Sequence, residues 1–336
     1  MNAREHILVI GGAGYVGSVL VRRLLAQGFR VRVLDALIYD NRASLSDLLD
    51  NERFSFVQGD FCDPGLLRQA LEGVDHLVML AALVGDPICR KYPEEARRVN
   101  EFGTLDMLRR VDDTRIQRLV FMSTCSNYGL RATDEPADED CALNPQSLYA
   151  ETKVEVERFL LEAPARFSFT PTVLRGATAF GESPRMRFDL TVNEFTGELA
   201  VGHELTVYDA DTWRPYCHLD DFAQAMVAVL EAPIEEVGGQ VFNLGDSREN
   251  YTKRMMVELL KRVIPEARIV FREGSTDPRN YRVTFEKIRT ALTFDAQTSV
   301  RTFIPELVAS ISHGNYADFA SHKERYGNYR IAKKPT

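Results

Sequence analysis

The sequence predicts an α/β fold in which a doubly wound parallel sheet is followed by a smaller C-terminal domain. Two observations lead to this fold class. Residues 6–26 have the pattern of a buried strand, a glycine-rich turn and an amphipathic helix, and strand and helix patterns then alternate through the first half of the chain. Such alternation is typical of parallel sheets covered by helices. Ligands of these sheets bind beyond the carboxyl ends of the strands, so functional residues are expected there.

The composition is that of a globular protein without a basic surface. The chain has 336 residues, of which 45% are hydrophobic and 27% charged, and its formal net charge is −8. We therefore expect neither nucleic acid nor an anionic membrane as a partner. The longest apolar run, residues 77–84, is too short to span a bilayer. The five cysteines are scattered without a C-x-x-C pair, which predicts free thiols in a reducing, cytoplasmic compartment and no metal site.

The strand, turn and helix of residues 6–26 have the form of a dinucleotide-binding fingerprint. Glycines stand at positions 11, 12, 14 and 17. We expect Gly11 to permit the tight turn, Gly14 to let the backbone approach a pyrophosphate, and Gly17 to let the helix pack closely. The phosphates would lie at the helix N-terminus, where free N–H groups and the helix dipole favour anions.

Acidic and small residues follow the next three predicted strands. Asp35 ends the strand 31–35, about 20 residues past the glycines, where a carboxylate accepts hydrogen bonds from the adenosine ribose. Its charge repels a 2′-phosphate, so NAD is favoured over NADP. Asp60 follows the strand 54–57 and could bind the adenine amino group, although this position also suits a helix cap. Ala81 and Ala82, at the end of the strand 76–84, would let backbone approach a flat cofactor, or would serve core packing.

Hydroxyl groups and a Tyr–Lys pair come next. The predicted strand 119–122 ends in Ser123 and Thr124, and a helix follows that carries Tyr149 and Lys153 four residues apart, on one face. A free tyrosine, with a pKa of about 10, is mostly protonated at neutral pH, but a nearby ammonium and a positive nicotinamide favour the phenolate. We therefore expect Tyr149 to be the general acid/base and Lys153 to tune it while holding the ribose. Thr124 or Ser123 would bind the reacting oxygen.

In this order the motifs resemble the extended short-chain dehydrogenase/reductases, specifically the NAD-dependent nucleotide-sugar epimerases and dehydratases. The resemblance covers nearly the whole chain and implies a Rossmann sheet with NAD as cofactor. It implies Thr124, Tyr149 and Lys153 as the catalytic triad. The implied cofactor-binding residues are Gly11, Gly14, Tyr15, Val16, Gly17, Asp35, Asp60, Phe61, Ala81, Ala82, Asn100, Tyr149 and Lys153.

The substrate-binding residues are expected where the sugar and its diphosphate would lie. Arg185 and Arg187 stand in a short loop after the strand 172–175 and would bind a diphosphate, unless they are ordinary surface residues. In the family, an arginine at the place of Arg214 clamps the nucleotide diphosphate, and Arg279 is the candidate for a second. The full predicted set is Ser123, Cys125, Ser126, Thr178, Arg185, Arg187, Asn193, Arg214 and Arg279.

Two departures from the family pattern bear on the reaction. Relatives that eliminate water carry Asp-Glu directly after the catalytic threonine, where this chain has Cys125 and Ser126. Neither side chain supplies a carboxylate, so a 4,6-dehydratase is disfavoured. Many epimerases carry asparagine at the place of Thr178. The segments 83–87, 183–190 and 277–279 look closest to a branch that includes enzymes oxidising C4 of GDP-heptoses.

The expected activity is NAD-dependent oxidation at C4 of a nucleotide-diphosphate sugar. If the 4-keto sugar rotates and is reduced on its other face, the enzyme is a 4-epimerase, which is the outcome we expect. If the ketone leaves, the enzyme is a net 4-dehydrogenase, and the reverse step would make it a 4-ketoreductase. A non-enzymatic NAD-sensing regulator is disfavoured because both Tyr149 and Lys153 are present.

The same reasoning divides the chain into parts. Residues 1–175 would form the NAD-binding domain, to which a segment near 215–245 returns. Residues 176–330 would form mainly the substrate-binding domain, and 331–336 a tail, with the polar stretch from 318 onward loosely held. The resemblance implies a homodimer that pairs through the helices near 94–110 and 148–163.

Overall fold

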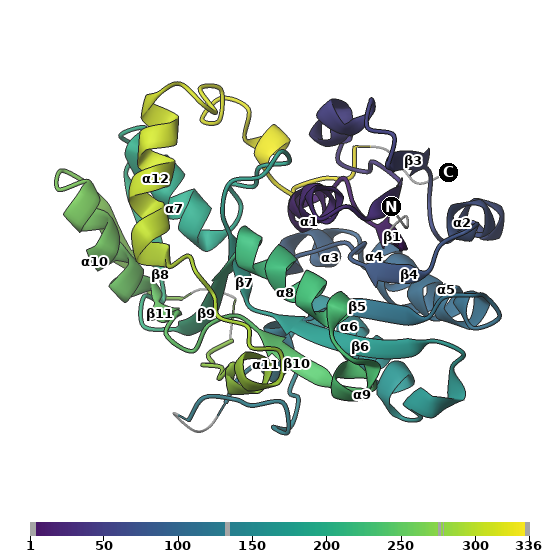
Figure 1. The fold of residues 1–336 in the computed structure, drawn as a ribbon. Coiled ribbons are helices and arrows are strands. Elements are labelled where there is room, and N and C mark those ends of the chain that lie inside the picture. Colours follow the sequence, from purple (N-terminus) through teal and green to yellow (C-terminus); the bar gives the residue numbers. More distant parts are fainter. Residues whose placement is uncertain (1–4, 132–134, 275–276, 278, 333–336) are drawn as a thin grey trace.

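A large parallel sheet runs through the computed structural model, which describes residues 5–131, 135–274, 277 and 279–332 (Figure 1). Within those residues the sheet has seven strands in the order β10-β6-β5-β4-β1-β2-β3, and each neighbouring pair is parallel. The predicted doubly wound α/β fold is confirmed. The strands are β1 (His6–Ile10), β2 (Arg30–Asp35), β3 (Phe54–Gln58), β4 (His76–Met79), β5 (Arg118–Thr124), β6 (Thr170–Gly176) and β10 (Val241–Leu244).

Helices cover both faces of this sheet because successive strand residues point to opposite sides. Val9, Val78 and Val120 pack under the first helical layer, whereas their neighbours Leu8 and Leu77 pack under the second. The first layer contains α1 (Tyr15–Ala26), α8 (Leu219–Glu231), α9 (Ile234–Val237) and α11 (Glu286–Ala291). The second contains α2 (Pro64–Leu71), α3 (Asp86–Lys91), α4 (Pro93–Arg97), α5 (Thr104–Val111) and α6 (Leu148–Leu161).

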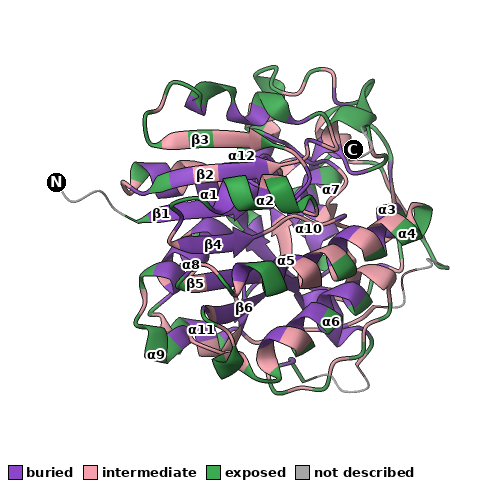
Figure 2. Cartoon of the chain, turned by 90° about the vertical axis from the view of Figure 1, so that its right-hand side faces the viewer, coloured by how far each residue is buried: buried purple, intermediate pink, exposed green. Residues whose placement is uncertain are grey.

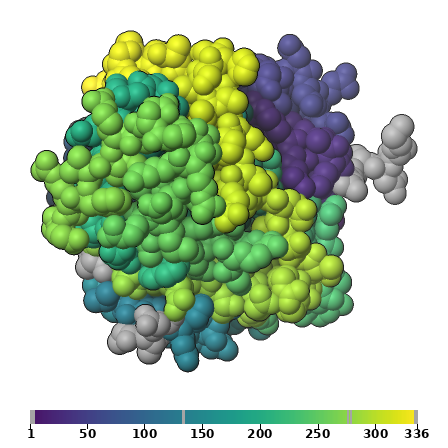
Figure 3. Space-filling model, turned by 90° about the vertical axis from the view of Figure 1, so that its left-hand side faces the viewer, coloured from purple at the N-terminus to yellow at the C-terminus, as the bar shows by residue number. Residues whose placement is uncertain are grey.

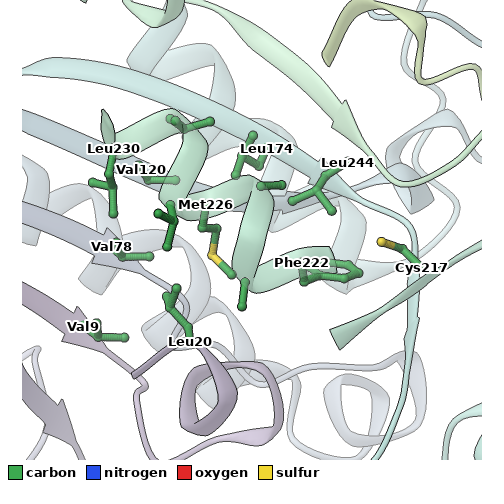
Figure 4. Packing of buried hydrophobic residues seen from close by; sticks show 14 of the residues in the cluster. Val9, Leu20, Val78, Val120, Leu174, Cys217, Phe222, Met226, Leu230 and Leu244 are labelled. Carbon is green, nitrogen blue, oxygen red and sulfur yellow. The ribbon is translucent and has the colours of Figure 1, made fainter. Parts of the chain in front are cut away.

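The core is therefore continuous from the strands into both layers. In Figure 2 the sheet strands β1 and β4 are buried along their length, while the helices in front of them show buried and exposed sides. Figure 4 shows Met226 and Leu230 of α8 grouped with Leu20 of α1 and the sheet residues Val78 and Val120. This packing brings a late part of the chain, α8, back onto the first helix.

A π-helical turn interrupts the helix between β4 and β5. The turn, η2 (Arg98–Gly103), continues directly from α4 and into α5. Such turns hold one extra residue and often occur at functional sites. Asn100 in this turn is buried, and Gly103 is required because a Cβ there would lie 2.3 Å from Sγ of Cys62. Short 3₁₀ turns occur elsewhere, at η1 (Arg42–Leu48), η3 (Cys125–Tyr128), η4 (Pro164–Arg166) and η5 (Lys323–Tyr326).

A second group of elements forms around its own aromatic core beside the carboxyl ends of the large sheet. It contains β7 (Thr178–Phe180), β9 (Trp213–His218) and β11 (Asn250–Thr252) in one sheet, and β8 (Leu205–Tyr208) with β12 (Ile269–Arg272) in another. Three helices, α7 (Thr191–Ala200), α10 (Lys253–Val263) and α12 (Val300–Ser312), pack on them around Phe180, Phe188 and Phe303. We propose the two-domain division above on this basis, with α8 and β10 as the returning segment.

The C-terminal part of the chain is not a loose tail up to residue 332, so that expectation is wrong for its described part. Phe319 is buried against Phe188, and the Ala332 N–H donates to the carbonyl oxygen of Ile38 at 2.7 Å. Figure 3 shows these late residues, in yellow, lying between the green C-terminal domain and the purple N-terminal residues. Residues 333–336 of the predicted tail lie outside the described residues.

Two findings concern the compartment and metal binding. All five cysteines are free. Within the part of the chain that the structure describes, no helix has both the length and the apolar character needed to cross a membrane, and no cluster of three or more His, Cys, Asp or Glu side chains is placed to hold a metal ion.

The α1–α8 contact yields a stability prediction. Leu20 is fully buried in it, so Leu20→Ala should lower the free energy of unfolding by about 2–5 kcal/mol, because it removes apolar contacts and leaves a cavity. Urea unfolding followed by circular dichroism would measure this. The matched control is Leu49→Ala. Because Leu49 is 54% exposed, this substitution should change the free energy of unfolding little. Equal losses in the two variants would contradict the packing described here.

Candidate active site

A cleft with a volume of about 620 Å³ lies along the carboxyl edge of the large sheet. Its walls include strand ends or the residues directly after them, such as Ile10, Asp35, Thr124 and Gly176. The C-terminal domain closes the other side with residues from α7, β9 and the segment around 277–281. The cleft therefore lies where a doubly wound sheet is expected to bind ligands.

The glycine turn at one wall of the cleft fits a dinucleotide. Gly11 adopts φ +88°, and a Cβ there would lie 2.7 Å from the Ala81 nitrogen. A Cβ on Gly17 would lie 2.3 Å from the Gly11 oxygen, so the helix could not approach the turn as it does. Gly14 is the N-cap of α1 and supplies no side-chain cap, which leaves the first N–H groups of the helix available to an anion. Tyr15 and Val16 also line the cleft.

The adenosine end of the predicted cofactor site contains two carboxylates. Asp35 accepts hydrogen bonds from the Ala13 and Leu37 N–H groups at 3.0 and 2.8 Å, and burial raises its pKa. Each carboxylate oxygen has a further lone pair, so Asp35 can still accept from ribose hydroxyls. Asp60 is bound by Arg98 at 2.8 Å, and Phe61 beside it is buried. All three predicted residues line the cleft.

Asn100 differs from the other predicted cofactor residues in its position. Ala81 and Ala82 line the cleft as expected, but Asn100 does not. Its side chain accepts from the Leu83 N–H at 2.8 Å and donates to the Leu83 oxygen at 3.0 Å. Both polar groups of the amide are thus used on the loop after β4. Asn100 therefore supports the shape of the loop after β4, and its contact with the cofactor stays a prediction.

The Tyr–Lys pair lies at the centre of the cleft. Ser147 caps α6 through a bond from the Ala150 N–H, so the helix begins at Leu148 and both Tyr149 and Lys153 face the cleft. The Lys153 Nζ donates to the Met122 oxygen at 2.8 Å and lies 5.9 Å from the centroid of the Tyr149 ring. Burial lowers the pKa of Lys153 to about 8, and burial also raises the pKa of Tyr149 above its ordinary value.

Of the predicted residues at the end of β5 and directly after it, Ser123, Thr124 and Ser126 line the cleft, whereas Cys125 does not. The Thr124 Oγ1 accepts from the Ser126 N–H at 3.1 Å, which holds the hydroxyl at the strand end. Cys125 is buried, and its Sγ donates to the Arg175 oxygen. Because η3 turns this side chain toward β6, the structure gives no support to its contact with substrate, which stays a prediction.

A buried ion pair beneath these residues was missed by the sequence reasoning. Arg175 of β6 and Glu157 of α6 meet at 2.8 Å, and both are almost fully buried. The Ser123 hydroxyl and the Asn127 amide bond to the same glutamate. The Ser123 hydroxyl is thus directed into this network, so of the two residues proposed to bind the reacting oxygen, Thr124 is favoured.

The predicted substrate arginines Arg214 and Arg279 share one acidic partner. Asp277 binds Arg279 at 2.7 Å and Arg214 at 3.0 Å, and although burial opposes it, the two guanidinium groups hold the pKa of this carboxyl well below its ordinary value. Arg279 also binds Asp86 at 2.9 Å and the Ser126 hydroxyl at 3.2 Å. Both arginines line the cleft, as does Thr178.

The loop before α7 carries the other predicted arginines. Arg187 forms a two-point ion pair with Asp189, with both distances 2.8 Å, and Arg185 and Arg187 line the cleft. Asn193 does not line it. Its amide is fully buried and bonds to the Tyr15 hydroxyl, the Gly181 N–H and the Arg187 oxygen. The polar groups of Asn193 thus hold the loop, so the structure gives no support to its contact with a phosphate, which stays a prediction.

Several cleft residues had no usable signal in the sequence. Tyr39, Lys253, Asn328 and Tyr329 line the cleft but lie outside the motifs, and Asp86 lies in the segment 83–87 but had no role assigned to it. Asp86 alone follows a recognisable feature, because it opens α3 directly after the predicted cofactor loop. Asn328 and Tyr329 come from the stretch that was expected to be loosely held.

The lowered pKa of Lys153 predicts how stability changes with pH. The folded protein releases this proton near pH 8, whereas the unfolded chain holds it to about pH 10.5, so between these values the unfolded state binds more protons and stability rises with pH. Below pH 8 the destabilising charge is fully present. Urea unfolding of the wild type and Lys153→Met at pH 7 and 9.5 would isolate this effect. The free energy of unfolding should rise more between pH 7 and pH 9.5 in the wild type than in Lys153→Met. Identical pH dependences in the two proteins would contradict the lowered pKa of Lys153.

Comparisons with known proteins agree with the geometry. The model of the NAD dependent epimerase/dehydratase family matches residues 7–245. UDP-glucuronic acid decarboxylase 1 of Arabidopsis thaliana is 31% identical over 320 residues, which cover 91% of this chain and 69% of that protein. A UDP-glucose 4-epimerase of Corynebacterium glutamicum is 30% identical over 325 residues, covering 91% and 95% of the two chains.

The solved structures agree with the fold. DesIV, a dTDP-glucose 4,6-dehydratase of Streptomyces venezuelae solved with NAD and TYD bound, has a TM-score of 0.83 and 26% identity, covering 92% of this chain and 98% of that one. The family match spans more than half of the chain and includes the glycine turn, Thr124, Tyr149 and Lys153. The protein belongs to the NAD dependent epimerase/dehydratase family, and it is accordingly an NAD-dependent enzyme built on a Rossmann sheet.

Proposed function

We propose that the protein is a nucleotide-sugar 4-epimerase that oxidises C4 of its substrate and then reduces the 4-keto sugar on the other face. The observation that carries this proposal is the position of Tyr149. It lies in the same cleft as the glycine turn on one side and the arginines Arg214 and Arg279 on the other. A cofactor on the first and a diphosphate on the second would bring a sugar to the phenol between them.

The residues present fit NAD and assign a role to each reactive group. The glycine turn would hold the pyrophosphate and Asp35 the adenosine ribose; NAD, when bound, supplies a hydride acceptor. Tyr149 takes the proton of the C4 hydroxyl, and the Lys153 ammonium favours the phenolate that this step needs. Thr124 donates a hydrogen bond to the reacting oxygen from the end of β5, where the Ser126 N–H orients it.

The residues after Thr124 support epimerisation over elimination of water. Cys125 is buried against the Arg175 oxygen, away from the cleft, and Ser126 presents a hydroxyl. Neither provides an acid or a base for removing a proton and a hydroxyl from neighbouring carbons. A 4,6-dehydratase would need such a pair.

Analysis of products from a panel of nucleotide sugars tests the proposal. UDP-, GDP-, dTDP- and CDP-sugars are incubated with the purified enzyme, and the products are examined by mass spectrometry and NMR. An epimerase gives a product of unchanged mass with inverted C4. Loss of two hydrogens with accumulation of reduced cofactor would instead identify a net 4-dehydrogenase, loss of water a dehydratase, and a product unchanged in every case would overturn the proposal.

Substitution of the phenol gives a sharper prediction. Tyr149→Phe should lower kcat by about 10²–10⁴-fold, because the general acid/base is lost while the ring still fills its place. Steady-state kinetics with the substrate found in the panel would measure this, and NAD binding should be retained. Tyr208→Phe is the control, since Tyr208 is exposed and lies outside the cleft. Unchanged turnover in Tyr149→Phe would refute the assigned role.

We also propose that the partners of the chain are a nucleotide-diphosphate sugar and a second copy of itself, and that it works in the cytoplasm. The five free thiols support a reducing compartment. Phe102 of η2 supports the dimer, because it is 59% exposed on the helical run 93–111, beside α6. Both helices belong to the surface through which we expect the copies to pair.

The dimer proposal predicts that Phe102→Asp converts the protein to monomers. A charge placed in an apolar contact between copies is costly to desolvate, whereas on a free surface it is harmless. Light scattering coupled to gel filtration would report the mass. Leu49→Asp, at an exposed leucine of another face, should leave the mass unchanged. A wild-type protein that is monomeric would overturn the proposal.

A further inference from the structure

The cleft contains two separate groups of arginines, and they belong to different elements. Arg214 and Arg279 meet at Asp277. Arg185 and Arg187 belong to the loop 181–189, which is fastened to the start of α1. The Ser183 hydroxyl lies 3.0 Å from the Ser18 hydroxyl and donates to the Tyr15 oxygen at 2.8 Å.

A second bond fixes the same loop from the helix side, since the Tyr15 hydroxyl donates to the Gly181 oxygen at 2.7 Å. Tyr15 is the first residue of α1, directly after Gly14. The loop therefore lies against the helix N-terminus and the glycine turn. This places its arginines on the cofactor side of the cleft.

Arg185 is a buried cation that forms no direct ion pair with a carboxylate in the described part of the chain. It is 6% exposed, and its guanidinium donates to three neutral oxygens, those of Met186, Gly327 and the Asn328 side chain, at 3.1–3.3 Å. None of the described carboxylates forms an ion pair with it, whereas Arg187 is matched by Asp189. Burial, with the nearby charge of Arg187, lowers the pKa of Arg185 to about 10. A buried unpaired charge is costly, so an anionic ligand would complete this site.

The surroundings of Arg185 indicate which anion this is. Its guanidinium carbon lies 5.2 Å from the centroid of the Tyr39 ring, and Tyr39 follows the end of β2. Its charge also interacts with Asp35, the carboxylate expected to bind the adenosine ribose. Arg185 is thus bounded by the glycine turn and the adenosine end, and the substrate arginines are paired elsewhere.

We propose that Arg185 binds the pyrophosphate of NAD on the side opposite the glycine turn, and that residues 326–332, here called the C-terminal strap, hold it there and retain the cofactor. This assignment replaces the predicted contact of Arg185 with the substrate diphosphate. It rests on NAD binding at the glycine turn, as in the proposed function. A planar guanidinium suits two phosphate oxygens at once.

The C-terminal strap connects both sides of the cleft. Its Gly327 oxygen and Asn328 side chain accept from Arg185, and the Asn328 N–H donates to Asp189 at 2.9 Å. On the other side, Lys91 donates to the Tyr329 oxygen at 3.1 Å, and Ala332 donates to Ile38 after β2. In Figure 1 this segment runs from the C-terminal domain past α1 to the N-terminal domain. Release of the cofactor then requires the strap to open, which suits an enzyme that reuses its NAD in each cycle.

The rate of NAD release tests this inference without any sugar substrate. The enzyme is loaded with radiolabelled NAD, diluted into unlabelled NAD, and sampled over time. Arg185→Met should release label at least about tenfold faster than the wild type, the loss expected for one charge-assisted hydrogen bond. Asn328→Ala should also speed release, because it frees both Arg185 and the strap. Arg254→Met, an exposed arginine outside the cleft, should release at the wild-type rate.

Arg214→Met is the matched variant from the other arginine group. It should keep the wild-type NAD release rate and raise KM for the nucleotide sugar. Arg185→Met should instead release NAD faster and leave this KM unchanged. The thermal unfolding midpoint of the NAD-free protein should change little in Arg185→Met, while the rise in midpoint caused by NAD shrinks. A merely structural Arg185 would lower the NAD-free midpoint instead. If Arg185→Met does not fold, Arg185→Lys, which keeps the charge and loses the planar fork, is judged by the same release rate.

Two outcomes would overturn the inference in different ways. Unchanged NAD release in the Arg185 variant, with a raised KM for the sugar, would return Arg185 to the substrate diphosphate and leave the proposed function intact. A wild-type protein that binds no NAD at all would overturn both.

Discussion

The buried ion pair between Arg175 and Glu157 fixes the position of the reactive groups. It joins β6 to α6, the helix that carries Tyr149 and Lys153, and it takes in Ser123 at the end of β5. Tyr128 extends the network, because it accepts from Arg175 and donates to Asn243 of β10. Buried ion pairs add little net stability, since desolvation offsets attraction, but breaking one leaves an uncompensated charge. The pair therefore acts mainly by fixing the positions of three strands and one helix relative to one another at the edge of the cleft.

Local spacing in the sequence was enough to predict the fold, and it named Tyr149 and Lys153, which line the cleft. The glycine positions 11, 14 and 17, the alternating strand and helix patterns, and the four-residue interval between Tyr149 and Lys153 are constraints within one element or between adjacent ones. Glu157 is a residue whose role local spacing does not reveal. It stands four residues after Lys153 on the same helix and looks like an ordinary charged surface residue, because its partner Arg175 is on a different element and only the sheet brings them together.

The asparagines show a second limit. Asn100 and Asn193 were predicted to contact ligands, and in the structure the side chains of both bond to the backbone of a loop beside the cleft. Loops that approach a cofactor lack the regular bonding of strands and helices, yet their buried N–H and C=O groups still need partners. A nearby amide provides both a donor and an acceptor. The sequence shows the amide, but not whether its partner is a ligand or the protein itself. In the same way, the sequence does not show whether an arginine binds the phosphates of the cofactor or those of the substrate.

In the π-helical turn at residues 98–103, the number of residues matters as well as their identity. Successive residues of a helix are rotated by about 100° around its axis, so losing a single codon here would turn Asn100 away from the loop that it holds. The flanking helices would keep their apolar pattern and would still fold, and no remaining residue would be replaced by another. Insertions and deletions in this stretch therefore affect the cofactor loop through helix phase, without any substitution in the cleft.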